Sequence, residues 1–407
     1  MDEISAWLRL TSVDGVGGNS QRKLLAAFGS PEAVFSAGEL SVAKTLNNAN
    51  KARALFHPEQ NNQKDFEKII ESALYWLSLP HHHLVTLGDE NYPHSLLEIP
   101  DPPTVLFVRG NLSLLKQKGL AIVGSRKATP LGKQNATFFA QQIAHFGLPI
   151  ISGLAEGIDA AAHKGALNAN GATLAVIGTG INKMYPAKNQ ALALELLEKN
   201  GAIVSEFKFN TPPVAANFPR RNRLISGLSS AVLVVEANLK SGSLITARLA
   251  AEQSREVFAI PGAIQNPFAQ GCHKLIKEGA KLVDCPEDIL EVLPFEPYIA
   301  AQNQKNLQLT VENLNPLTNA PDPIIPNEKN QNTEKNPRST RENIEHSPNC
   351  LDESSLILNA MGYAPCDVDT LTERTKLPPS AILIGLMALE LSAKITTLPG
   401  GYYQRLK

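Results

Sequence analysis

The chain has 407 residues, of which 43% are hydrophobic and 19% charged, and its formal net charge at pH 7 is -1. This composition is typical of a soluble globular protein of two or three domains. No apolar run is long enough to span a membrane, and Met1–Ile4 lacks the basic start of a signal peptide. The four cysteines form no C-x-x-C pair, which argues against a zinc site or a disulfide framework and predicts a cytoplasmic location.

Residues 1–80 are predicted to form a small helical domain. Short helices are expected from Ile4 to about Leu79, one of them over Ser20–Phe28, and Asp14–Gly18 forms a glycine-rich turn before it. Helix, glycine turn and helix resemble a SAM or helix-hairpin-helix unit, whose turn amides can hold a duplex phosphate. Because glycine turns also join many packed helices, we favour a packing role and keep phosphate binding as the alternative.

Residues 81–295 alternate between short apolar strands and helices, which predicts an α/β domain. The expected strands are His83–Gly88, Thr104–Arg109, Leu120–Val123, Pro149–Ser152, Thr173–Ile177, Ala202–Ser205, Ala231–Val235, Val257–Ile260 and Lys281–Val283. Strands this short and this uniformly apolar are buried on both faces, so we expect an extended Rossmann-type, mostly parallel sheet. Neither a G-x-G-x-x-G fingerprint after the first parallel strand nor a Walker A sequence is present, so no cofactor is expected.

The composition changes near the C-terminal end. Residues 296–350 are rich in Asn, Pro, Gln, Glu and Lys, which predicts a disordered linker. Residues 351–407 predict a C-terminal winged-helix domain. Its expected elements are helices near Ser354–Met361, Val368–Lys376 and Ser380–Leu391 and a hairpin that turns at Pro399–Gly401. Because the third helix is mostly Ala, Leu and Ile, it lacks the polar side chains that read a major groove, and we expect a protein-contact or self-contact role.

The stretch Leu120–Leu131 has the chemistry of an anion site. A strand ends at Gly124, and Ser125, Arg126 and Lys127 follow it. Thr129 is the expected N-cap of the next helix, with Pro130 at its first position. Amides at a helix N-terminus favour an anion, and an arginine there can grip a phosphate with two hydrogen bonds. An ordinary turn with a solvated Arg-Lys pair is the alternative.

Two further turns have similar chemistry. Gly178–Gly180 follows one predicted strand, and Lys240–Ser243 comes shortly after another. In an open parallel sheet such turns lie along one edge, where they would form a groove for a polyanion or a nucleotide. The region Asp101–Leu293 holds 20 Lys and Arg against 14 Asp and Glu, so it is mildly basic, as expected for an anionic partner.

Other charged residues in this domain allow two interpretations each. Phe218–Arg223 places three arginines in four positions, which suits either a phosphate grip or a solvated cluster. Lys183 and Lys188 follow the Gly178 turn. Asp159 and His163 share a helix face and could do general base chemistry, but no nucleophile is evident, so we favour a structural hydrogen-bonded pair.

An ordered series of stretches covers the whole predicted sheet domain. They are Val123–Arg126, Ser152–Asp159 with Ala162-His163, Ala175–Gly180, Tyr185-Pro186, Phe218–Arg223, Ser241–Thr246 and Ala259–Gly262. Together they resemble the DprA/Smf family of DNA-processing proteins. The helical N-terminal region and the winged-helix C-terminal region also fit the layout of that family.

The resemblance implies a non-enzymatic protein of natural transformation. Such proteins bind single-stranded DNA, shield it from nucleases, help to load the RecA recombinase and form a homodimer through the sheet domain. The DNA-binding residues expected from the motifs are Gly124, Ser125, Arg126, Lys127, Gly178, Thr179, Gly180, Lys183, Lys188, Phe218, Arg221, Asn222, Arg223, Lys240, Ser241, Gly242 and Ser243.

One position departs from the pattern of the family. Some members place a lysine directly after Tyr-Pro, where this chain has Ala187 and then Lys188, so either Lys183 or Lys188 is the expected DNA contact. A channel for one strand usually pairs cations with stacking rings, for which Phe218 and Tyr185 are the candidates.

Two other functions compete with this hypothesis. Rossmann-type hydrolases of the lysine-decarboxylase-like group also hold a nucleotide phosphate with such turns. They typically carry a P-G-G-x-G-T turn followed by Glu, whereas this chain has Pro261-Gly262-Ala263. A regulator that reads duplex DNA through the winged helix is disfavoured by the apolar third helix.

Overall fold

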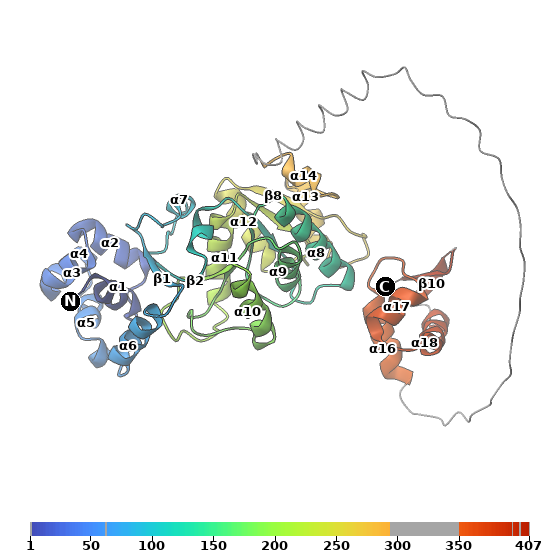
Figure 1. The fold of residues 1–407 in the computed structure, drawn as a ribbon, viewed down its shortest axis with the longest axis horizontal. Helices are drawn as coiled ribbons and strands as arrows, with labels where there is room; N and C mark the ends of the chain where they lie inside the picture. Colours follow the sequence, from blue (N-terminus) through green and yellow to red (C-terminus); the bar gives the residue numbers. More distant parts are fainter. Residues whose placement is uncertain (1, 62, 294–349, 393, 399, 407) are drawn as a thin grey trace, which may run out of the picture.

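The computed structural model describes residues 2–61, 63–293, 350–392, 394–398 and 400–406. A bundle of short helices, a nine-stranded sheet domain and a small C-terminal domain follow one another along the long axis (Figure 1). Apart from Cys350, the predicted linker lies outside the described residues. Within those residues, no helix combines the length and the apolar character needed to cross a lipid bilayer.

The N-terminal helices confirm the predicted helical region. They are α1 (Glu3–Ser12), α2 (Gly18–Phe28), α3 (Pro31–Ser36), α4 (Gly38–Leu46), α5 (Ala49–Phe56), the 3-10 helix η1 (Pro58–Asn61) and α6 (Phe66–Leu77). In the glycine turn Val16 is buried, whereas Gly15 and Gly17 are exposed, and the Asp14 amide donates to Gln63 Oε1 at 2.9 Å. The Asp14 carboxylate forms an ion pair with Lys208 of the sheet domain. These contacts favour the packing role of the turn over phosphate binding.

The sheet is mostly parallel, as predicted. Its strands are β1 (His82–Thr86), β2 (Val105–Gly110), β3 (Leu120–Val123), β4 (Ile150–Ser152), β5 (Thr173–Val176), β6 (Ala202–Ser205), β7 (Ala231–Val234), β8 (Glu256–Ala259) and β9 (Lys281–Leu282). Their order is β1-β2-β6-β5-β4-β3-β7-β8-β9; the pairs β1-β2 and β2-β6 are antiparallel, and the other pairs are parallel. Each strand begins and ends within two residues of its predicted bounds.

Helices cover both faces of the sheet. They are α7 (His94–Leu97), the 3-10 helix η2 (Leu112–Lys116), α8 (Pro130–His145), α9 (Ile158–Asn168), the 3-10 helix η3 (Ala187–Asn189), α10 (Gln190–Glu198), α11 (Asn217–Leu228), α12 (Ser243–Glu252), α13 (Gln270–Lys277) and α14 (Glu287–Leu290). Side chains of β3 alternate between the two layers. Leu120 and Ile122 pack in the core beneath α8 and α9, whereas Ala121 and Val123 pack in the core beneath α11 and α12.

The strand order fixes where a ligand can bind. The chain leaves β3 toward β4 on one side, while β7 pairs with β3 on the other, with Val123 opposite Val234. Ligands of open α/β sheets bind outside the carboxyl ends of strands at such a reversal of order. The loops after β3 and β7 meet there.

The C-terminal domain contains three helices and a hairpin. Its elements are α16 (Cys350–Met361), α17 (Val368–Thr375), α18 (Pro379–Leu391), β10 (Ile395–Leu398) and β11 (Tyr402–Arg405). Its core contains Ile357, Leu371, Leu386 and Ile395. This architecture confirms the predicted winged helix.

Candidate nucleic-acid interface

A cleft opens at the switch point between β3 and β7. Its volume is about 550 Å³. It is lined by Val123, Gly124, Arg126, Ala155, Asp159, Tyr185, Pro213, Ala215, Phe218, Pro219, Arg221, Asn222, Ile225, Ser241, Gly242, Ser243 and Thr246. Two of the three turns predicted to share one sheet edge, the one after Val123 and the one at Ser241–Ser243, therefore meet in this cleft, whereas Gly178–Gly180 does not line it.

The loop after β3 is fixed by Glu236, which follows β7. The Ser125 amide donates to the Glu236 carbonyl at 2.8 Å. The buried Glu236 carboxylate accepts hydrogen bonds from the Thr129 amide at 2.9 Å and the Thr129 hydroxyl at 2.6 Å. Thr129 is the N-cap of α8, with Pro130 at its first position, as predicted. The negative group at this helix N-terminus is thus a side chain of the protein, and the expectation that these amides hold a ligand anion is wrong.

Arg126 provides the accessible positive charge of the cleft. Its side chain is exposed, and its guanidinium carbon lies 5.0 Å from the centroid of the Phe218 ring. The Tyr185 ring lies 5.7 Å from Phe218, centroid to centroid, at an interplanar angle of 43°. Among the described residues Arg126 has no ion-pair partner. A free guanidinium beside two aromatic rings can hold an anion and a planar base together.

Gly178 allows the Phe218 ring to approach the end of β5. A β-carbon built on Gly178 would lie 3.0 Å from the Phe218 ring. Gly178 is buried and is not exposed to a ligand, but its lack of a side chain leaves room for the Phe218 ring.

Arg221 forms the floor of the cleft and is only 3% exposed. Its guanidinium donates to the Gly153 carbonyl at 2.7 Å and to the Val176 carbonyl, and its Nε donates to Asn222 Oδ1 at 3.2 Å. Burial lowers the pKa of Arg221 to about 10, so this side chain remains charged at neutral pH. Arg221 thus connects the loop that follows β4 with the end of β5.

Asp159 and His163 do not form the predicted pair. Asp159 Oδ2 accepts the amides of Gly153 at 3.1 Å and Ala155 at 3.4 Å, and burial raises the pKa of its carboxyl while Arg221 opposes that rise. His163 Nδ1 instead bonds the Thr173 hydroxyl at 2.7 Å. The two residues lie on one helix, but each has its own structural partners.

The buried His163 predicts acid sensitivity. Burial lowers the pKa of this imidazole to about 3 from 6.5, so the native state does not bind the proton that the unfolded state takes up below pH 6.5. The free energy of unfolding should therefore fall as the pH falls below 6.5, with a slope of up to about 1.4 kcal/mol per pH unit from this group. Urea unfolding between pH 7 and pH 5 measures this slope. His163→Asn, which keeps a donor for Thr173, should flatten it, and an unchanged slope would contradict the assignment.

The predicted residues divide into two groups. Gly124, Arg126, Phe218, Arg221, Asn222, Ser241, Gly242 and Ser243 line the cleft, whereas Ser125, Lys127, Gly178, Thr179, Gly180, Lys183, Lys188, Arg223 and Lys240 do not. Arg223 forms ion pairs with Glu206 and with Asp101; the Arg223 Nε lies 3.4 Å from the Asp101 carboxylate. Lys188 lies 3.5 Å from Glu156, and the Thr179 hydroxyl bonds the Lys183 carbonyl at 2.5 Å. The exposed Lys127 follows Arg126 in the same loop.

Two further residues that line the cleft, Asp159 and Thr246, are not among the predicted DNA-binding residues. Asp159 belongs to the stretch Ser152–Asp159 of the family pattern, but its predicted role is a pair with His163. Thr246 follows Ser243 by three residues on α12, so helical spacing could have indicated it.

Gly157 is expected to be essential for the geometry of the Arg126 loop. Its φ is +84°, and an added β-carbon would lie 2.2 Å from the Ser125 carbonyl oxygen. Gly157→Ala should lower the free energy of unfolding by about 1–3 kcal/mol and displace the loop. Thermal unfolding measures the effect. Gly242→Ala is the matched control, since nothing lies within 4 Å of its added β-carbon, and an equal loss in both variants would contradict this explanation.

Comparison with known proteins gives consistent matches. The family model described as DNA recombination-mediator protein A matches residues 83–294, and the model of the DprA winged helix domain matches residues 347–401. Protein Smf of Escherichia coli (strain K12) is 40% identical over 406 residues, which cover 99% of this chain and 96% of that protein. DNA processing protein DprA of Streptococcus pneumoniae (strain R6) is 45% identical over 207 residues, which cover 51% of this chain and 73% of that protein. The X-ray structure of DprA from Streptococcus pneumoniae matches with a TM-score of 0.60 and 35% identity, covering 72% of this chain and 99% of that chain.

Proposed function

Since the chain belongs to the DNA recombination-mediator protein A (DprA) family, we propose that it binds single-stranded DNA in the cleft between β3 and β7. The observation that carries this proposal is the Arg126 guanidinium, which has no ion-pair partner in the part of the chain that the structure describes and lies over the Phe218 ring, itself in contact with the Tyr185 ring. A single strand offers both a phosphate and an unstacked base to such a pair, whereas a duplex keeps its bases stacked.

The start of α12, which also lines the cleft, suits a phosphate as well. The hydroxyls of Ser241 and Ser243 lie 2.6 Å apart at the start of α12, and the side-chain amide of Asn222, which also lines the cleft, donates to the Gly242 carbonyl at 3.5 Å. These groups donate to phosphate oxygens and do not read a base sequence. Binding should therefore tolerate any sequence and depend strongly on salt.

The wider role that we propose is that of a recombination mediator in natural transformation. The chain would shield incoming strands in the cytoplasm, help to load the RecA recombinase and form a homodimer through the sheet domain. We propose no catalytic reaction, because the two amides that bond Asp159 and the burial of His163 leave neither group poised for proton transfer. Sedimentation of the full chain across concentrations tests the homodimer.

A salt titration tests DNA binding. The anisotropy of a labelled oligothymidylate and of a mixed-sequence duplex is measured with the full chain at rising salt. We expect tighter binding to the single strand and an affinity that falls with salt at a log-log slope of about -0.7 per phosphate contact. Equal affinity for both nucleic acids, or none for either, would refute the proposed function.

A further inference from the structure

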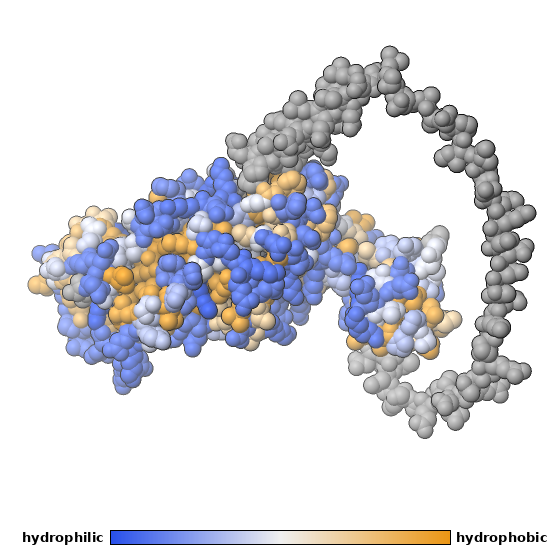
Figure 2. Space-filling view, in the orientation of Figure 1, coloured by the Kyte–Doolittle hydropathy of each residue, from blue (hydrophilic) through white to orange (hydrophobic). Residues whose placement is uncertain are grey.

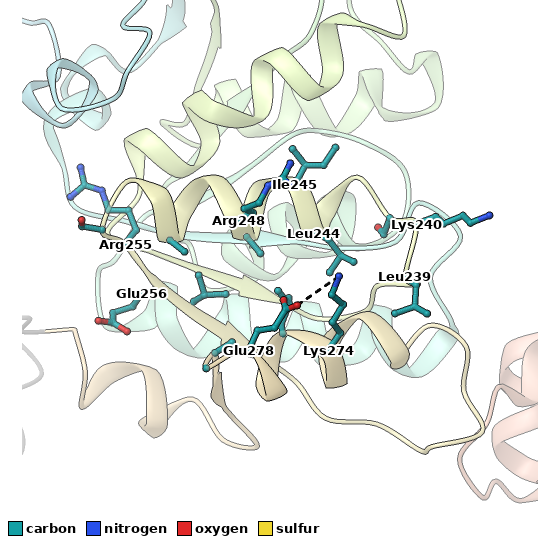
Figure 3. A pocket seen from close by; sticks show the side chains of 17 residues that line it. Leu239, Lys240, Leu244, Ile245, Arg248, Arg255, Glu256, Lys274 and Glu278 are labelled. Atoms are coloured by element: carbon teal, nitrogen blue, oxygen red, sulfur yellow. Dashed lines mark ion pairs between the residues drawn. The ribbon is translucent and has the colours of Figure 1, made fainter.

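A second hollow, here called the α12–α13 groove, lies between these two helices over β8. Its volume is about 900 Å³. Apolar side chains line its middle, among them Leu244, Ile245, Val257 and Leu275. Figure 3 shows Leu244 of α12 pointing toward α13, where Lys274 and Glu278 form an ion pair, whereas Ile245 and Arg248 project on the other side of α12 in this view. The loop before α12 separates this groove from the DNA cleft, and Ser241 borders both.

The charges of the groove argue against nucleic acid as its ligand. Lys274 is paired with Glu278 at 3.7 Å, Arg248 with Glu252 at 3.9 Å and Arg255 with Glu98 at 2.6 Å. An apolar floor with a rim of balanced charge is typical of a surface that receives an amphipathic or apolar helix.

The winged-helix domain carries a helix of that kind. In α18 the residues Ile382, Gly385, Leu386 and Leu389 are buried in the domain core. The other side is apolar too, with Leu383 44%, Ile384 60%, Met387 67% and Leu391 90% exposed; these four form the α18 stripe. Hydrophobic residues gather on that part of the domain in Figure 2. A helix that is apolar on all sides is normally covered on all sides.

The stripe and the groove also agree in charge. Within α18 the one charged residue is Glu390, in the last turn, where the helix dipole is also negative. Lys240 lies at one end of the groove and Glu256 toward the other (Figure 3), with Lys274 nearer to Lys240. The acidic end of α18 therefore matches the lysine end of the groove.

The position of the winged helix decides which copy supplies the stripe. The domain contacts the start of α8 of its own chain, where Arg374 donates to Gln134 Oε1 at 3.3 Å. Tyr363 and Ala364 line a small cavity together with Leu131 of the same helix. The α18 stripe stays exposed in that position, and so does the groove. We propose that α18 of one copy seats in the α12–α13 groove of a second copy. This contact does not depend on DNA binding in the cleft.

Site-specific cross-linking of the full chain tests the contact. In a Cys285→Ser, Cys350→Ser background, a Met387→Cys copy is mixed with an Ile245→Cys copy and treated with a short bismaleimide. Leu40→Cys, 82% exposed in the N-terminal domain, replaces Met387→Cys in the control mixture. We expect at least a tenfold higher yield of mixed dimer from the Met387→Cys mixture. Equal yields would overturn the proposal. The proposal would also be overturned if a single chain that carries both Met387→Cys and Ile245→Cys formed the cross-link within itself while the mixture gave no dimer.

Charge reversal provides an independent readout. Lys274→Glu should lower the cross-linking yield severalfold, and Glu390→Lys in the other copy should restore it. If Glu390→Lys did not restore the cross-linking yield, the proposed orientation of α18 in the groove would be overturned. Anisotropy of labelled oligothymidylate, measured on the same proteins, separates the two proposals, because cross-linking without DNA binding would refute only the proposed function.

Discussion

Arg126→Ala is expected to weaken the binding of single-stranded oligonucleotides by about 10- to 100-fold. A hydrogen bond to a charged group contributes about 1.5–3 kcal/mol, and every 1.4 kcal/mol changes affinity tenfold. The loss also removes the cation that lies over the Phe218 ring. Because the side chain is exposed, the melting temperature should not change. Fluorescence anisotropy and thermal unfolding measure the two effects.

Arg248→Ala is the matched control for that experiment. Arg248 belongs to the same domain and has 70% of its side chain exposed, but it does not line the cleft. Arg248→Ala removes the same charge as Arg126→Ala. A similar loss of affinity in both variants would therefore mean that the oligonucleotide is held by general electrostatic attraction and not by the cleft. The slope of log affinity against log salt concentration should also become less steep, by about 0.7, in Arg126→Ala but not in Arg248→Ala.

Arg221→Met is expected to have the largest effect on stability. Removing the buried guanidinium leaves the carbonyls of Gly153 and Val176 without a donor and leaves the buried Asp159 without its positive neighbour. Breaking a buried charged arrangement in this way costs about 3–5 kcal/mol. Urea unfolding followed by circular dichroism should show the transition at a lower denaturant concentration.

Arg220→Met tests whether the burial of Arg221 is the reason for the large loss of stability expected in Arg221→Met. The Arg220 side chain is 50% exposed, and the buried Glu206, 3.6 Å away, keeps Arg223 as an ion-pair partner when Arg220 is lost. The loss of Arg220 should therefore cost less than about 1 kcal/mol. If Arg220→Met destabilised the chain as much as Arg221→Met, the structural role assigned to Arg221 would be wrong.

The sheet could be predicted from the sequence because its signal is local. Runs such as Leu120–Val123 are apolar, short and ended by glycine, and each buried strand of a parallel sheet repeats that pattern. The meeting of the loops after β3 and β7 followed from the general topology of such sheets. Arg126, Phe218 and Ser241–Ser243 could therefore be placed in one site.

The roles of the three neighbouring arginines could not be predicted, because helix rotation decides them. Successive residues of α11 point about 100° apart, so Arg221 enters the floor while Arg220 and Arg223 turn toward Glu206. No local pattern reveals that rotation. Glu236 was missed for a different reason: it bonds Thr129 across 107 positions of the chain, and only the fold brings the two together.

Hydrogen exchange with and without a saturating oligothymidylate tests the central claim most directly, because it locates the strand on the unmodified protein. We predict slower amide exchange at Gly124–Lys127 and Ser241–Ser243, with the α18 region unchanged. Protection confined to the winged-helix domain, with no change at these two loops, would contradict the assignment of the cleft as the binding site.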